Sequence, residues 1–289
     1  MPETRKKDVG RGTKKNRNNF IIAIPSYRRA ETLREKTLAM LESYNVPANI
    51  IYVFVANEAE RKDYLAVLKP GSYSKLIVAK PGMGAVRNFI TEYFPIGKRI
   101  LNIDDDIKDF MMPGGPGKRL VRVHGFMQIM NKAFSLAAEK KMRLFGFYPV
   151  ANHYFMKNRV TEDLRYIIGA MWGIINPGID ALEVTLDDKE DVQRSIIMYI
   201  LDGGVLRFEG YTPVTAYYKE PGGMQEERTL NRVDKSAKAI VDAYPDFATL
   251  NLTKKSGFSE VRLRDKRESD KRIFGPKVLA EFTPPRLSR

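Results

Sequence analysis

Residues 99–108 read RILNIDDDIK, an apolar run that ends in three consecutive carboxylates. The run from Arg99 to Ile103 has the composition of a buried β-strand, and Asp104, Asp105 and Asp106 follow at its carboxyl end. Neighbouring carboxylates raise one another's pKa unless a cation or solvent relieves them. The stretch therefore predicts a strand whose carboxyl end binds a positive group.

Strands and helices alternate in the sequence that precedes this strand. We expect strands at 20–25, 50–56 and 75–79, separated by helices at 30–44, 58–68 and 85–94. Such alternation predicts an α/β fold with a mostly parallel central sheet and right-handed crossovers. In sheets of this kind, ligands bind at the carboxyl ends of the strands, where the three aspartates lie.

The pattern changes after the aspartates. We expect a Gly/Pro-rich loop at 111–119, a long helix at 123–141, antiparallel apolar strands at 144–150 and 166–175, an acidic run at 186–195 that leads into a helix, and another helix near 229–243. The predicted organisation is a basic disordered tail at 1–17, an α/β domain at 18–221 and a basic C-terminal extension at 222–289 that packs on it.

Composition restricts the class of protein. The chain has 289 residues, 43% of them hydrophobic, which is enough for a sizeable core. It has no Cys, which excludes disulfides and thiolate metal sites and favours a reducing, cytoplasmic compartment. The sequence lacks a signal-peptide pattern and any stretch of about 18 apolar residues, so we expect no membrane partner.

The net charge of +14 is concentrated at the two ends of the chain. Residues 1–17 hold seven Lys/Arg against two acids, and residues 254–289 hold eleven against five. Basic ends indicate a polyanionic partner, nucleic acid first, although a solvated tail is the alternative for residues 1–17. The residues that we expect to contact DNA phosphates are Lys254, Lys255, Arg262 and Arg264, with Lys266 and Arg267 beside them.

The aspartates have the chemistry of a metal site. Side chains alternate along an extended segment, so Asp104 and Asp106 are expected to point the same way with their backbones about 7 Å apart. Oxygen ligands, in a chain without Cys and with only His124 and His153, fit a hard ion such as Mn2+ or Mg2+. A helix cap or a cluster of solvated acids is the alternative.

Five short motifs resemble, in order and spacing, the GT-A glycosyltransferases of the family 2 kind. They are IPSYRR at 24–29, VAN at 55–57, GMGAVRN at 82–88, NIDDD at 102–106 and the pair Glu190–Asp191. This resemblance covers about residues 20–201. The whole chain is more narrowly similar to the TET-associated glycosyltransferases, relatives of the base J glucosyltransferase found with phage and kinetoplastid DNA-modification systems. The narrower match rests on IPSYRR, the aspartate run and TPVTAYYKEPGGMQ at 212–225.

The resemblance implies a GT-A fold, a nucleotide-sugar donor such as UDP-glucose, and Mn2+ or Mg2+ held by Asp104 and Asp106. The residues that it implies as nucleotide-sugar contacts are Pro25, Tyr27, Arg28, Asn57, Arg87, Asp104 and Asp105. Many relatives have an aspartate at the position of Asn57. The alternative for Arg87 is that it is an exposed charge on the surface of a helix and does not contact the nucleotide.

The same resemblance makes Asp191 the general base of an inverting transfer and Glu190 a neighbour that shapes the site. The alternative is that the whole acidic run is a helix N-terminus, where the backbone dipole favours acidic residues.

The candidate contacts of the acceptor are aromatic residues. Trp172, the only tryptophan, lies in an apolar strand where it can stack on a base or sugar or belong to the core. Phe147, Tyr148, His153 and Tyr154 share this neighbourhood and this ambiguity. With the basic ends, these residues lead us to expect transfer to 5-hydroxymethylcytosine or 5-hydroxymethyluracil in double-stranded DNA. The alternatives are a transferase with a glycan or small acceptor and a non-catalytic nucleic-acid-binding protein.

Overall fold

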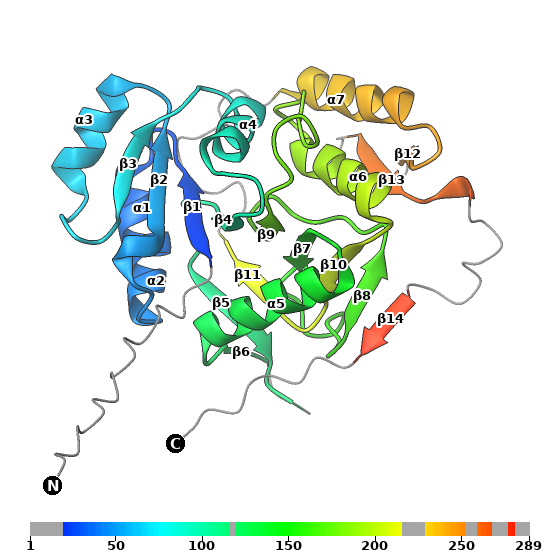
Figure 1. Ribbon diagram of the computed structural model, residues 1–289, viewed down its shortest axis with the longest axis horizontal. Helices are drawn as coiled ribbons and strands as arrows, with labels where there is room; N and C mark the ends of the chain where they lie inside the picture. The colour runs from blue at the N-terminus through cyan, green and yellow to red at the C-terminus, as the bar shows by residue number, and fades with distance from the viewer. Residues whose placement is uncertain (1–19, 116–118, 216–228, 252–258, 268–276, 281–289) are drawn as a thin grey trace, which may run out of the picture.

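The computed structural model describes residues 20–115, 119–215, 229–251, 259–267 and 277–280. Within these ranges the chain forms a nine-stranded sheet with the order β14-β8-β10-β7-β9-β4-β1-β2-β3 (Figure 1). Its strands are β1 (Ile21–Pro25), β2 (Ile51–Val55), β3 (Lys75–Val78), β4 (Arg99–Ile103), β7 (Leu144–Phe147), β8 (Val160–Asp163), β9 (Met171–Ile175), β10 (Val205–Phe208) and β14 (Lys277–Ala280). Only β8 and β9 run against the direction of the other strands, so the prediction of a mostly parallel α/β sheet is confirmed.

Helices cover both faces of this sheet. They are α1 (Ala30–Leu33), the π-helix η1 (Arg34–Leu38), α2 (Ala39–Ser43), the short 3-10 helix η2 (Ala48–Ile50), α3 (Glu58–Val67), α4 (Met83–Tyr93), α5 (Phe126–Lys140), α6 (Glu190–Asp202) and α7 (Leu230–Ala243). One core cluster joins the sheet to α1–α3 and α5, and a second joins it to α4, α6 and α7. Alternate β1 residues enter the two clusters, Ile22 the first and Ala23 the second, as expected for a strand that is buried on both faces.

The second half of the sheet departs from the sequence prediction. β7 and β9 pair antiparallel as expected, but the strand expected at 166–175 begins only at Met171. The preceding residues cross the sheet face below α6, where the backbone N–H of Ile167 donates to Ser195 Oγ (3.0 Å). Strands β8 and β10, four residues each, were not predicted, because so short a run carries little periodic signal.

Two smaller sheets flank the centre. One has the order β11-β5-β6, formed by β11 (Thr212–Val214), β5 (Asp109–Pro113) and β6 (Leu120–Arg122). Residues 111–113 of the loop expected at 111–119 therefore belong to a strand that pairs antiparallel with β6. The other sheet pairs β12 (Ala248–Asn251) with β13 (Glu260–Leu263).

The described parts of the segment 222–289 pack on the remainder of the chain. Ile240 of α7 lies in the same core cluster as Tyr199 of α6, and the Tyr199 hydroxyl donates to Asp265 (2.7 Å). β14 pairs antiparallel with β8 and extends the central sheet. The tail at 1–17 and the predicted DNA contacts Lys254 and Lys255 lie outside the described residues. Across the described ranges, no helix is both long and apolar enough to cross a membrane.

Candidate active site

The three aspartates form a turn after β4. The backbone N–H of Asp104 donates to the carbonyl of Ala170 (2.9 Å), which continues the pairing with β9 by one residue. The buried hydroxyl of Thr37 then donates to the Asp104 carbonyl (2.7 Å) and accepts from the Ile107 N–H (2.9 Å). Since the chain turns here, the expected strand geometry, with alternating side chains through Asp106, is wrong.

Asp105 is enclosed by protein. It is 6% exposed, accepts a 2.6 Å hydrogen bond from Ser26 Oγ, and lies 3.5 Å from the guanidinium of Arg29. Burial raises the pKa of Asp105 to about 7. This side chain connects the end of β1 to the aspartate turn. The sequence predicted that Asp105 contacts the nucleotide sugar, but in the structure its carboxylate is already bound by Ser26 and Arg29.

Asp104 and Asp106, the other two carboxylates of the turn, are the candidate cation ligands. The Asp104 side chain is 30% exposed and Asp106 is 8% exposed, and no described basic side chain forms an ion pair with Asp106. Burial, followed by the charge of Asp104, raises the pKa of Asp106 to about 6. The described residues contain no cluster of three or more His, Cys, Asp or Glu side chains able to hold a metal. Two carboxylates fit Mg2+ or Mn2+ when substrate phosphates and water complete the coordination.

Arg87 connects this turn to the acidic pair on α6. It is 4% exposed, so the alternative of a surface helix charge is wrong. Its Nη2 donates to Asp104 (2.7 Å) and to the Gly169 carbonyl (3.1 Å), and its Nε lies 3.7 Å from Glu190. A single buried cation thus holds carboxylates from two distant parts of the sequence.

The glycines before Arg87 permit a close approach of the acidic run. A Cβ on Gly84 would lie 2.8 Å from the Leu186 carbonyl oxygen, and Gly82 has a φ of +98°. The Gly84 N–H, at the N-terminus of α4, donates to Asp187 (2.9 Å). Asp187 also lies 3.3 Å from Arg232 of α7, so helix α7 is held to this segment.

Glu190 is a buried member of the acidic pair. It is 5% exposed, and its Oε1 lies 3.4 Å from Nη1 of Arg194, which is itself 1% exposed. Burial raises the pKa of Glu190 to about 7, with a further contribution from the charge of Asp191. Between two guanidinium groups and away from solvent, Glu190 is placed to shape the site.

Asp191 is half-buried and held by three donors. Its Oδ2 accepts from the Tyr166 hydroxyl (2.5 Å) and from the Gly169 N–H (3.2 Å), and its Oδ1 accepts from the Val192 N–H (2.9 Å). Sequence reasoning missed Tyr166, because nothing near it in the sequence marks a contact with a residue 25 positions away. The arrangement fixes a carboxylate close to the Arg87 network, with lone pairs left to accept a proton.

Trp172 lies in the core. It is 3% exposed, and its ring packs against the guanidinium groups of Arg194 (3.7 Å from the ring centroid) and Arg87 (5.6 Å). The ring is therefore not available to stack on an acceptor, and the core alternative holds for this residue. Among its neighbours, Phe147 is fully buried, whereas Tyr154 is 80% exposed.

The predicted nucleotide contacts at β1 and β2 lie at the carboxyl ends of these strands. Pro25 ends β1 and is buried, Tyr27 is half-buried, and the exposed Arg28 has a φ of +54°. The buried Glu60 accepts from the Arg28 N–H (3.1 Å) and so holds this turn. The Asn57 side chain accepts from the Glu60 N–H (2.9 Å) as the N-cap of α3, which is a structural role that the sequence did not reveal.

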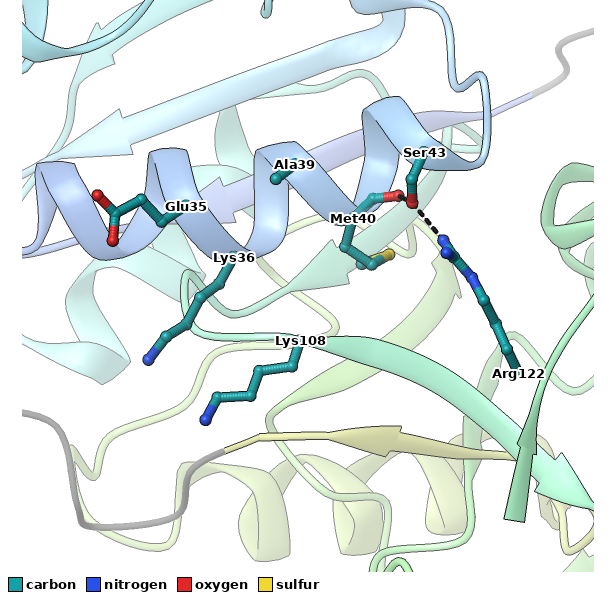
Figure 2. A pocket seen from close by; sticks show the side chains of 7 residues that line it. All are labelled: Glu35, Lys36, Ala39, Met40, Ser43, Lys108 and Arg122. Atoms are coloured by element: carbon teal, nitrogen blue, oxygen red, sulfur yellow. Dashed lines mark hydrogen bonds between the residues drawn. The ribbon is translucent and has the colours of Figure 1, made fainter.

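A pocket of about 450 Å³ lies between η1–α2 and the segments that carry Lys108 and Arg122 (Figure 2). Lys108, two residues after Asp106, and Lys36 of η1 extend to the same side of this pocket, and Arg122 donates a hydrogen bond to Ser43. Its lining residues are Glu35, Lys36, Ala39, Met40, Ser43, Lys108 and Arg122. Three cations and one carboxylate make this pocket positive, a feature that the sequence reasoning did not anticipate.

Comparisons with known proteins bear on the fold. No protein-family model matches the chain, and no curated protein sequence does. Among solved structures, the mannosyltransferase PcManGT from Pyrobaculum calidifontis, in complex with GDP-Man and Mn2+, is similar with a TM-score of 0.53 at 12% identity, over 79% of this chain and 64% of that one. The chain has the GT-A fold.

Two other GT-A structures are more distant. TarS 1-349 of S. aureus has a TM-score of 0.46 at 13% identity, over 78% of this chain and 66% of that one. Glucosyl-3-phosphoglycerate synthase from Mycobacterium tuberculosis, in complex with Mn2+, UDP-glucose and phosphoglyceric acid, has a TM-score of 0.44 at 9% identity, over 86% and 90%. The chain thus spans slightly less than two thirds of the length of TarS 1-349 and of the mannosyltransferase.

This GT-A fold brings together some of the predicted site residues and separates others. Asp104, Arg87, Glu190 and Asp191 are joined through hydrogen bonds and ion pairs around Gly169. The predicted phosphate contacts Arg262 and Arg264 are exposed on and after β13, a part of the chain that packs with α7.

Proposed function

We propose that this chain is a metal-dependent glycosyltransferase that moves a sugar from a nucleotide diphosphate donor. The observation that carries this proposal is the pair Asp104 and Asp106, a partly buried and a buried carboxylate at the carboxyl edge of a GT-A sheet, close enough that the charge of Asp104 acts on Asp106. A diphosphate is negative, so carboxylates can face it only with a cation between them. The Mn2+ and GDP-Man in the Pyrobaculum mannosyltransferase structure support the same assignment.

Asp104 and Asp106 would hold Mn2+ or Mg2+, which when bound neutralises the donor diphosphate as it leaves. Arg87 orients the Asp104 carboxylate through its 2.7 Å hydrogen bond. Asp105 keeps the turn attached to β1 through Ser26. Pro25, Tyr27, Arg28 and Asn57 remain the proposed contacts of the nucleotide, because they lie where β1 and β2 end.

Asp191 is the proposed general base. A carboxylate that accepts the proton of the acceptor hydroxyl must be fixed in place and must reach the hydroxyl. The Tyr166 and Gly169 donors fix Asp191, and its partial exposure leaves access for an acceptor. Glu190 holds the neighbouring arginines Arg87 and Arg194 in place.

The proposed acceptor is a hydroxymethylated pyrimidine in DNA, 5-hydroxymethylcytosine or 5-hydroxymethyluracil, with UDP-glucose as the proposed donor. The similarity to the TET-associated enzymes and the net charge of +14 support this choice. The hydroxymethyl oxygen projects into the major groove, and flipping of the base would bring it to Asp191. Two outcomes would replace this proposal: transfer to a glycan or small acceptor, or nucleic-acid binding without catalysis.

Donor turnover tests the enzyme assignment. The purified chain is incubated with Mn2+ and a panel of nucleotide sugars, and release of the nucleotide diphosphate is followed. We expect release that stops on chelation and is lost in Asp104→Asn and Asp106→Asn, while the exposed Asp180→Asn matches the wild type. Full turnover by either aspartate variant across a Mn2+ titration would refute the metal site. If the wild type turns over no nucleotide sugar with any acceptor, the assignment of the chain as an enzyme would be refuted.

A further inference from the structure

An exposed aromatic loop follows β7. Tyr154 is 80% exposed and Phe155 is 64% exposed, and nearby Val150 is 55% exposed. The His153 ring packs beside the Tyr154 ring at a centroid distance of 4.2 Å, which limits the orientations available to both. Large aromatic side chains that lie together in water are a feature of binding surfaces rather than of folding cores.

The loop begins beside the aspartate turn. Because β9 runs antiparallel to both β4 and β7, those two strands end at the same edge of the sheet. Trp172 pairs with Asn102 on β4 and with Gly146 on β7, so Tyr148 is level with Asp104. With a strand spacing of about 4.8 Å, the start of the loop is about 10 Å from the aspartates.

The base of this loop carries a cluster of arginines. Arg207 of β10 binds Glu209 (2.9 Å) and lies over the ring of Tyr148, with Cζ 5.6 Å from the centroid. Arg165 and Arg159 each have a buried Nε without a hydrogen-bond partner, and neither forms an ion pair with a described carboxylate. Burial lowers the pKa of Arg165, and the charges of Arg207 and Arg159 lower it further, whereas the nearby carboxylates Glu209 and Asp163 raise it. Three arginines face these two carboxylates, and such an excess of positive charge is expected where an anionic group binds.

The cluster contacts the proposed general base through one residue. Arg207 Nη1 donates to the Tyr166 carbonyl (3.4 Å), and the Tyr166 hydroxyl donates to Asp191 (2.5 Å). In the sheet, β10 lies on one side of β9 and β1 and β2 lie on the other, so a group bound on the arginines would lie across Asp191 from the proposed nucleotide contacts.

We propose that this surface holds an unpaired nucleotide of the acceptor strand, with its phosphate on the arginines and its base against the exposed aromatic rings. We call it the acceptor platform, and it consists of Tyr154, Phe155, Arg159, Arg165 and Arg207. This inference rests on the proposed function, because it specifies how the acceptor binds at the same site. It also replaces Trp172, which the structure encloses, with aromatic rings that a base can reach.

Charge decides between a nucleotide and a neutral glycan. Aromatic rings stack on sugars and on bases, but a neutral sugar carries no charge to offset the excess of the three arginines over Glu209 and Asp163. A nucleotide supplies one phosphate per base, and base stacking on aromatic rings tolerates any sequence. The combination of arginines with exposed rings therefore matches single-stranded or flipped DNA.

Binding of short oligonucleotides to the full chain tests the acceptor platform. The probes are a fluorescent single-stranded oligonucleotide and its duplex, followed by anisotropy. We expect the double variant Tyr154→Ala, Phe155→Ala to weaken binding of the single strand about tenfold or more, because each base stacked on an aromatic ring contributes that much. Arg159→Gln should lower the slope of log K against log salt by about 0.7, the value for one single-strand phosphate contact.

A matched control replaces two exposed apolar residues elsewhere, Leu65→Ala and Ile96→Ala, which are 53% and 77% exposed in the wild type. It should bind both probes as the wild type does. A change of less than twofold in the platform variant, or a wild type that binds no oligonucleotide but transfers sugar to a glycan, would overturn the platform. Nucleotide-sugar turnover by the wild type, measured in the same preparation, separately decides the proposed function.

Discussion

The hydroxyl of Tyr166 donates a 2.5 Å hydrogen bond to Oδ2 of Asp191. Tyr166 precedes β9 and Asp191 lies in the first turn of α6, so the contact joins a segment that crosses the sheet to the helix above it. The Gly169 N–H donates to the same oxygen, and the Gly169 carbonyl accepts from Arg87. The proposed base and the proposed metal site are thereby linked through the backbone of one glycine.

Tyr166→Phe should slow transfer about tenfold or more without changing donor binding. The variant keeps the ring but removes one hydrogen bond to a charged group, an interaction that contributes about 1.5–3 kcal/mol. Single-turnover transfer and donor affinity, measured on the same preparation, check both effects. Tyr93→Phe is the matched control, and transfer by Tyr166→Phe at the wild-type rate would separate this tyrosine from the chemistry.

Asp191→Asn should bind the donor normally and transfer sugar about a hundredfold more slowly or worse, the usual contribution of a general base. The amide can still accept from Tyr166 and Gly169, so the local structure should survive. Single-turnover transfer and donor affinity are measured on the same preparation. Transfer at the wild-type rate would assign the base to another residue, and weakened donor affinity would indicate a structural helix cap.

The sequence located the elements of the site whose signals are local. The aspartates follow an apolar run, and the Glu190–Asp191 pair opens a helix, so both are visible within a few residues. The environments of Tyr166 and Trp172 could not be predicted from local signals. Both depend on the packing of α6, which brings Asp191 to Tyr166 and Arg194 to Trp172, and no spacing in the sequence encodes that packing.

The parallel half of the fold was predictable for a similar reason. Each of β1 to β4 is a strong apolar run followed by a helix or a turn, and these strands pair in the order β4-β1-β2-β3. The turn at Asp104 to Asp106 was mistaken for extended strand, because the hydroxyl of Thr37, a residue far away in the sequence, bends the chain there.

Glu190→Gln should change the pH dependence of stability. Burial raises the pKa of Glu190 in the folded state to about 7, so between its unfolded pKa and pH 7 the folded state binds the extra proton. The wild type should therefore lose stability relative to Glu190→Gln as the pH rises from 5 to 7, and the difference should level off above pH 7. Thermal unfolding from pH 5 to pH 8 provides the measurement. Glu92→Gln, an exposed position on α4, should follow the wild type. A constant difference between the wild type and Glu190→Gln over this range would contradict the assignment.

The basic ends should govern the salt dependence of DNA binding. Removal of residues 1–17, or charge reversal at Lys254, Lys255, Arg262 and Arg264, should weaken duplex binding and lower the log–log salt slope by about 0.9 for each phosphate that the variant no longer neutralises. Affinity is measured by anisotropy at several salt concentrations. Reversal of the exposed Lys62 and Lys69 near α3 is the matched control. Equal slopes in all variants would show that these ends are solvated and bind no phosphates.

Sugar transfer to DNA tests the central claim most directly. The full chain is incubated with Mn2+, nucleotide sugars and duplexes or single strands that contain cytosine, methylcytosine, hydroxymethylcytosine or hydroxymethyluracil, and the DNA is digested to nucleosides and weighed by mass spectrometry. We predict a hexose-sized mass gain on a hydroxymethylated nucleoside only, which disappears in Asp191→Asn. No gain on any DNA, together with transfer to a free glycan, would contradict the account and leave only the GT-A fold.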